Sequence, residues 1–228
     1  MLGAMPLSTH DIDAAIVDLD GTMVDTVGDF EAALGRMLAD LGHAPVSREF
    51  IARTVGKGTE HLIHSTLAEA GAPASAYAHA LQRYGQHYLA INGEHSSVYA
   101  GVVEGLRAMR AAGWRLACLT NKPTAFARPL LAKKGLDVFF DHAFGGDDFA
   151  RKKPDPLPLV ETCRALGSKP ARTLMVGDSS NDAAAARAAG CPVLLVSYGY
   201  NHGEPVAAAG ADAVVDRLDE VLPLLQRR

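Results

Sequence analysis

The pattern of hydrophobic and polar positions divides this chain into a short strand, a long helical block and a regular alternation of strands and helices. The apolar run Ala14–Val17 ends in the sequence DLDGT (residues 18–22), which predicts a buried parallel strand leading into a tight turn. Behind this turn, apolar residues recur at helical spacing as far as Ile91. Breaks rich in glycine and proline divide that stretch into about four predicted helices.

Beyond residue 101, predicted strands and helices follow one another in turn. The predicted strands cover residues 115–120, 142–144, 173–176, 193–196 and 213–215. The predicted helices cover residues 102–112, 124–134, 157–166, 182–189, 205–209 and 218–225. This alternation predicts an α/β fold, a doubly wound parallel sheet with helices on both faces. A usual strand order for such a sheet, numbered along the chain, is 3-2-1-4-5-6, which would make Asp18 and Asp178 neighbours.

The domain organisation follows from the distance between the first two predicted strands. A parallel crossover needs about a dozen residues, and the stretch from Asp18 to Arg115 is far longer. We therefore interpret residues 25–96 as a helical cap domain inserted into a core domain made of residues 11–24 and 97–228. Residues 1–10 have neither the basic region nor the apolar core of a signal peptide, and we read them as a loose leader.

Composition excludes several classes of partner. With 228 residues, of which 48% are hydrophobic, the chain can bury a substantial core. Its net charge of −4 gives no basic footprint for nucleic acid or for an anionic membrane, and no apolar run approaches the ~18 residues of a membrane span. The three cysteines lie far apart and form no CxxC pattern, which favours a reducing compartment, by default the cytoplasm.

Polar residues at three further strand ends or turns indicate chemistry. They lie in residues 120–122, 152–156 and 177–182, and a doubly wound sheet brings such segments to one edge. Carboxylates gathered there need a cation, and an oxygen-only set without His or Cys suits Mg2+. The candidate metal ligands are Asp18, Asp178, Asp182 and a backbone carbonyl near Asp20.

The remaining polar groups suit a phosphoryl group. Thr120, Asn121 and Lys153 provide hydroxyl, amide and ammonium donors for its non-bridging oxygens. One carboxylate can attack phosphorus to give an aspartyl phosphate, while a second protonates the leaving alkoxide and later activates water. Asp18 and Asp20 suffice for both roles.

The four polar segments resemble, in order, the four motifs of the haloacid dehalogenase superfamily. They read DLDGT (18–22), LTNK (119–122), KPDP (153–156) and GDSSND (177–182). The resemblance spans residues 14 to about 200, and the helical insertion resembles that superfamily's first cap type. It implies that Asp18 is the nucleophile and Asp20 the acid and base. It also implies that Thr120 and Lys153 bind phosphate and that Asp178 and Asp182 hold the metal.

Two further segments, VGKG (55–58) and YGYNHGEP (198–205), resemble the phosphoglycolate phosphatases within that superfamily. The resemblance implies hydrolysis of 2-phosphoglycolate, a small phosphorylated metabolite. We expect the protein to be a monomer or homodimer. Gly56 lets the cap loop close over the site, and Lys57 is the candidate cation for the substrate's carboxylate. Alternatives are another sugar phosphate or pyrophosphate as substrate, or a phosphomutase. From another class, a phospho-accepting receiver-like switch domain uses similar groups but needs no cap.

Overall fold

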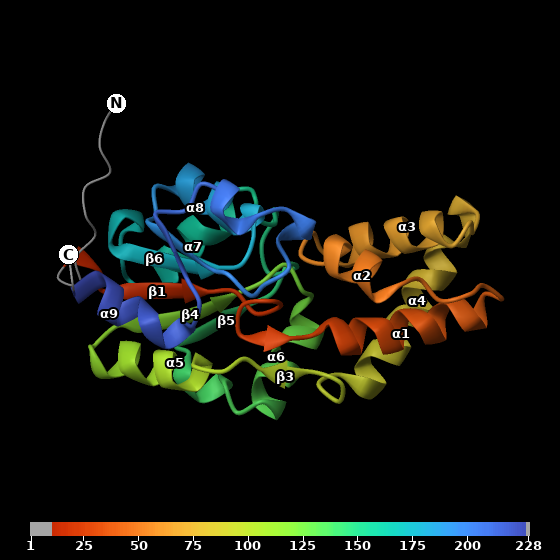
Figure 1. The fold of residues 1–228 in the computed structure, drawn as a ribbon, viewed down its shortest axis with the longest axis horizontal. Helices are drawn as coiled ribbons and strands as arrows, with labels where there is room; N and C mark the ends of the chain where they lie inside the picture. The colour runs from red at the N-terminus through yellow and green to blue at the C-terminus, as the bar shows by residue number, and fades with distance from the viewer. Residues whose placement is uncertain (1–10, 227–228) are drawn as a thin grey trace.

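A six-stranded parallel sheet forms the centre of the larger part of the molecule (Figure 1). The structure is a computed structural model that describes residues 11–226, so the predicted leader lies outside the described residues. The strands lie in the order β5 (His142–Phe144), β4 (Arg115–Leu119), β1 (Ala14–Val17), β6 (Thr173–Gly177), β7 (Val193–Val196) and β8 (Ala213–Val215). Numbered along the chain within this sheet, the order is 3-2-1-4-5-6. The predicted α/β fold and strand order are therefore confirmed.

Helices cover both faces of the sheet. This is required because successive side chains of β1 are apolar and point to opposite faces. Ala15 and Val17 belong to one hydrophobic cluster and Ala14 and Ile16 to another. The first cluster includes side chains of α5 (Val102–Ala111), α6 (Thr124–Lys133) and α9 (Val221–Gln226). The second includes side chains of α7 (Leu157–Ala165) and α8 (Ser180–Ala189).

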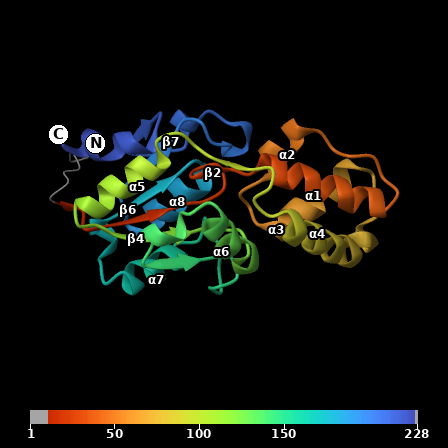
Figure 2. The same cartoon turned by 90° about the horizontal axis from the view of Figure 1, so that it is seen from below.

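The predicted helical block forms a bundle beyond one end of the sheet (Figures 1 and 2). Its four helices are α1 (Val27–Asp40), α2 (Arg48–Thr54), α3 (Thr59–Glu69) and α4 (Tyr77–Ile91). They share a third hydrophobic cluster, in which Tyr84 and Tyr88 are almost fully buried. Phe126 of α6 belongs to this cluster too, so the bundle also packs against the part of the molecule that contains the sheet.

A two-stranded antiparallel ribbon joins the bundle to the rest of the chain. It pairs β2 (Val24–Asp25) with β3 (Ser97–Val98). Two residues are too few to show a strand period, so the sequence does not predict it. The buried Asp29 carboxylate accepts hydrogen bonds from the backbone N–H groups of Gly93 (2.9 Å) and His95 (2.7 Å), which ties α1 to the segment before β3. The predicted cap boundaries fall at this ribbon, and the division into two domains remains a prediction.

Three predicted helices differ in detail from the structure. The helix predicted over residues 205–209 is a single 3-10 turn, Val206–Ala208, because so short a segment cannot offset the cost of helix nucleation. The last predicted helix begins as a 3-10 turn, Leu218–Glu220, before α9. Helix α8 begins two residues before the predicted start, at Ser180. In the range that the structure describes, no helix is both long enough and apolar enough to cross a bilayer.

Candidate active site

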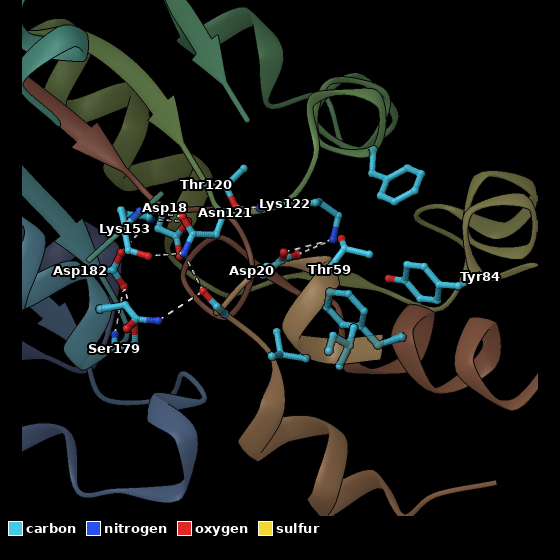
Figure 3. A pocket seen from close by; sticks show the side chains of 17 residues that line it. Asp18, Asp20, Thr59, Tyr84, Thr120, Asn121, Lys122, Lys153, Ser179 and Asp182 are labelled. Carbon is cyan, nitrogen blue, oxygen red and sulfur yellow. Dashed lines mark hydrogen bonds and ion pairs between the residues drawn. The ribbon is translucent and has the colours of Figure 1, made fainter. Parts of the chain in front are cut away.

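An open cavity lies between the carboxyl ends of the strands and the helical bundle (Figure 3), and its volume of about 480 Å3 includes space open to solvent. Its walls differ in chemistry. The polar wall includes Asp18, Asp20, Thr120, Asn121, Lys153, Ser179, Asn181 and Asp182. The apolar wall includes Phe30, Val55, Leu62, Tyr84 and Phe126. Motifs from four distant parts of the sequence therefore meet in one space, as the predicted strand order requires.

Asp18 lies directly after β1, where its backbone N–H donates to the carbonyl of Val176 at 2.9 Å. Lys153 Nζ is 2.9 Å from Asp18 Oδ1 and 2.7 Å from Asp182 Oδ1. Burial raises the pKa of Asp18 to about 7, against the opposing effect of the Lys153 ammonium. Although burial acts in the other direction, Asp18 and Asp182 hold the pKa of Lys153 above its ordinary value.

Asp18, Asp178 and Asp182 form a group of buried carboxylates, each offering an oxygen within 4.8 Å of the others. Burial, followed by the charges of Asp182 and Asp18, raises the pKa of Asp178 well above its ordinary value. Among the described residues, Asp18 Oδ1 has the ion pair with Lys153 but no aligned hydrogen bond. An oxygen-only set of three buried carboxylates, with one ammonium beside it, fits a hard divalent cation such as Mg2+.

The side chain of Asp20 is not part of this group, because it is engaged elsewhere. Its carboxylate accepts a hydrogen bond from Thr26 Oγ1 at 2.8 Å and contacts Lys122 Nζ at 2.9 and 3.1 Å. Its predicted contact with the metal, through the backbone carbonyl, remains a prediction. The sequence analysis missed Thr26 and Lys122 as partners of Asp20. Lys122 directly follows Asn121 in the LTNK motif, but its almost complete burial is not visible in sequence.

Asn121 and Thr120 follow β4, and both are buried. The Asn121 amide donates to the carbonyls of Gly56 (2.9 Å) and Lys153 (2.8 Å), and its oxygen accepts from the Lys153 backbone N–H (3.0 Å). Asn121 thus connects the VGKG loop to the site. Gly56 lines the cavity, whereas Lys57 is exposed and does not line it. The predicted phosphate and substrate contacts of these residues remain predictions.

The segment after β7 supports Asp178, which the sequence analysis did not foresee. The Tyr200 backbone N–H donates to Asp178 Oδ2 at 2.7 Å, while its hydroxyl donates to Asp25 Oδ1 at 2.8 Å. A Cβ atom at Gly199 would overlap the Asp178 side chain, so only glycine allows this approach. Gly199 and Tyr200 lie in the YGYNHGEP segment, which the sequence analysis connected to the family but not to Asp178.

Comparisons with known proteins find relatives over most of the chain. A family model for haloacid dehalogenase-like hydrolases matches residues 12–190. Over 216 residues, the chain is 44% identical to a phosphoglycolate phosphatase of Thiobacillus denitrificans, covering 92% of this chain and 93% of that protein. It is 46% identical over 213 residues to a plasmid phosphoglycolate phosphatase of Cupriavidus necator, covering 93% and 92%.

A solved structure shows the same fold. The crystal structure of a protein from Haemophilus somnus, described as a predicted phosphoglycolate phosphatase, matches with a TM-score of 0.90. That protein is 31% identical, and the match covers 95% of this chain and 99% of the other. The resemblance of the four motifs is thereby confirmed at the level of the family. The chain belongs to the haloacid dehalogenase-like hydrolases.

Proposed function

We propose that this protein is a Mg2+-dependent phosphatase that hydrolyses 2-phosphoglycolate to glycolate and phosphate. The observation that carries the proposal is the position of Asp18, next to Lys153 and within the group of three buried carboxylates. The names of the relatives at 44% and 46% identity support the choice of substrate.

In the proposed reaction, a carboxylate oxygen of Asp18 attacks phosphorus and forms an aspartyl phosphate. The bond to the leaving oxygen breaks, and Asp20 gives its proton to the departing alkoxide. Asp20 then removes a proton from the attacking water, and hydrolysis restores Asp18 and releases phosphate. Lys153 and Thr120 donate to the phosphoryl oxygens throughout.

Asp18, Asp178 and Asp182, with the backbone carbonyl of Asp20, are the residues that would hold Mg2+. When bound there, the ion neutralises the gathered carboxylates and the charge of the phosphoryl group. The apolar wall of the cavity, with Phe30 and Leu62 from the bundle, keeps water away from this polar region.

The alternative enzyme activities share the first half of this reaction. Another sugar phosphatase or a pyrophosphatase would differ in the leaving group, and a phosphomutase would return the phosphoryl group to the substrate. A panel of phosphate esters assayed with Mg2+ distinguishes them. The family match over residues 12–190 gives no support to a receiver-like switch domain. A cytoplasmic location and a monomeric or homodimeric state remain predictions.

The proposal is tested by the substitution Asp18→Asn. The amide keeps the shape of the side chain but is not a nucleophile, so we expect turnover of 2-phosphoglycolate to fall by about 10³-fold or more. Circular dichroism and thermal unfolding should show that the fold is kept. Asp137→Asn, an exposed change outside the cavity, is the matched control. Turnover close to wild type by folded Asp18→Asn protein would contradict the proposal.

A further inference from the structure

Two lysines line the cavity, and their ammonium groups differ in the number of partners that they contact. Lys153 contacts Asp18 and Asp182 and also donates to the carbonyl of Leu119 at 2.9 Å. Lys122 is as deeply buried, with 2% of its side chain exposed. Among the described residues, however, its ammonium hydrogen-bonds only to the two oxygens of Asp20. Since an ammonium has three donors, Lys122 retains capacity for a second anionic partner.

Aromatic residues of the helical bundle hold Lys122 in place. Its Nζ lies 4.4 Å from the centre of the Phe30 ring and 4.7 Å from that of Tyr88. Figure 3 shows Lys122 and Asp20 between the polar group around Asp18 and the ring of Tyr84. In such poorly hydrated surroundings, an ion pair with a bound anion is stronger than at the surface. The charge of Lys122 therefore lies at the boundary between the polar and apolar walls.

The position of the leaving group, which rests on the proposed function, connects this charge to the substrate. Phosphorus must lie at Asp18 and the leaving oxygen at Asp20. In 2-phosphoglycolate the carboxylate carbon is only two bonds from that oxygen, so the carboxylate must lie close to the partners of Asp20. Lys122 Nζ is 2.9 Å from Asp20 Oδ1, whereas the exposed Lys57 does not line the cavity.

We infer that Lys122 binds the carboxylate of the substrate. It thereby selects phosphate esters that carry an acid group on the ester carbon. In this role Lys122 is a specificity-determining residue supplied by the LTNK motif, and the bundle contributes by orienting it through Phe30 and Tyr88. The predicted role of Lys57 is then unnecessary for recognition of the carboxylate.

The test compares two substrates that differ only at the inferred contact. In 2-hydroxyethyl phosphate, a neutral hydroxymethyl group replaces the carboxylate of 2-phosphoglycolate. For Lys122→Met in the full chain, we expect kcat/KM for 2-phosphoglycolate to fall about 10- to 100-fold more than for 2-hydroxyethyl phosphate, largely through KM. Lys122→Arg keeps the charge and should restore part of the difference. The exposed change Lys169→Met should alter neither substrate.

Equal losses on both substrates would overturn the inference, because Lys122 would then serve only Asp20 or the fold. A selective loss in Lys57→Ala with none in Lys122→Met would overturn it too. If Lys122→Met fails to fold, Lys122→Gln gives the same comparison with a shorter, neutral donor. Wild-type protein that hydrolyses neither ester would overturn the proposed function and the inference together. Turnover of 2-phosphoglycolate without any selective loss overturns the inference alone.

Discussion

At the scale of single residues, the most consequential feature is the excess of negative charge in the carboxylate group. Asp18, Asp178 and Asp182 are at most 7% exposed, and only Lys153 forms ion pairs with members of this group among the described side chains. Burial, and after it the repulsion between these carboxylates, raises the pKa values of Asp18 and Asp178. The group therefore favours either protons or a cation.

This charge predicts how stability depends on pH in metal-free protein. The pKa of Asp18 is about 7 in the folded state and 3.8 ordinarily, so between these values the folded state binds more protons. The free energy of unfolding should then fall as pH rises from about 4 to about 7. In EDTA, the thermal unfolding temperature should be higher near pH 5.5 than near pH 7.5. We expect a difference of about 2–4 °C or more.

Mg2+ should reduce that difference by stabilising the protein at the higher pH. Asp18→Asn should reduce it as well, because the amide does not titrate. Stability that increases across this pH range in EDTA would contradict the prediction.

The oxygen-only ligand set also predicts the response of activity to metals. EDTA should abolish turnover, Mg2+ should restore it, and Mn2+ should restore it in part. Excess Ca2+ should inhibit, because it imposes a larger and less regular coordination shell. EDTA already saturated with Mg2+ is the control for effects of the chelator itself. Full activity in free EDTA would show that the carboxylates work without a metal.

The sequence was sufficient to identify the site residues that lie in motifs. It was not sufficient to identify a residue such as Lys122, whose contact with Asp20 depends on burial in the folded protein. Asp18, Thr120, Lys153 and Asp178 each follow a strand or occupy a turn with a recognisable pattern, and the structure brings them together. Lys122 was missed as a partner of Asp20 because burial of a lysine depends on rings from the distant helices α1 and α4. These contacts form only in the tertiary structure, and the sequence around Lys122 does not indicate them.

At the scale of secondary structure elements, helix α5 is positioned by a close approach to backbone. A Cβ atom added at Gly105 would lie 2.7 Å from the carbonyl oxygen of Leu218, in the turn before α9. At Gly35, in the middle of α1, a Cβ atom would meet nothing within 4 Å. Both glycines are inside helices, so they differ mainly in what surrounds them.

This pair gives a matched prediction for stability. Gly35→Ala should stabilise the protein by about 0.4–1 kcal/mol, because alanine has less freedom in the unfolded chain. Gly105→Ala should destabilise it by about 1–3 kcal/mol, since the methyl group must push α5 away from Leu218. Urea unfolding of both variants measures the two changes. Stabilisation by both would mean that α5 and the turn can separate without cost.

The sequence predicted helices from a repeating period and strands from short apolar runs, and it missed the elements that have neither signal. The six strands of the sheet were located because each is a short apolar run between helical segments. The ribbon of Val24–Asp25 with Ser97–Val98 has no period, and its pairing depends on how the bundle returns the chain to the sheet.

At the scale of the whole molecule, the site exists only where the two parts of the chain meet. The bundle contributes most of the apolar wall of the cavity, to which α6 adds Phe126, and the segments that follow the strands contribute the polar wall. Contacts of the VGKG loop and the start of α3 hold the parts together: Asn121 donates to the Gly56 carbonyl, and Lys152 pairs with Glu60 at 3.3 Å. Residues of both parts therefore line the cavity.

The strand order also constrains how the protein is made. Strand β1 is the first strand of the sheet to leave the ribosome, yet its two neighbours are Arg115–Leu119 and Thr173–Gly177. During synthesis, the apolar strand that leads into Asp18 therefore has no strand partner while the whole bundle is translated. Such distant pairings slow folding, and they leave β1 open to wrong partners in the growing chain. The bundle, whose helices follow one another directly, can pack during that wait.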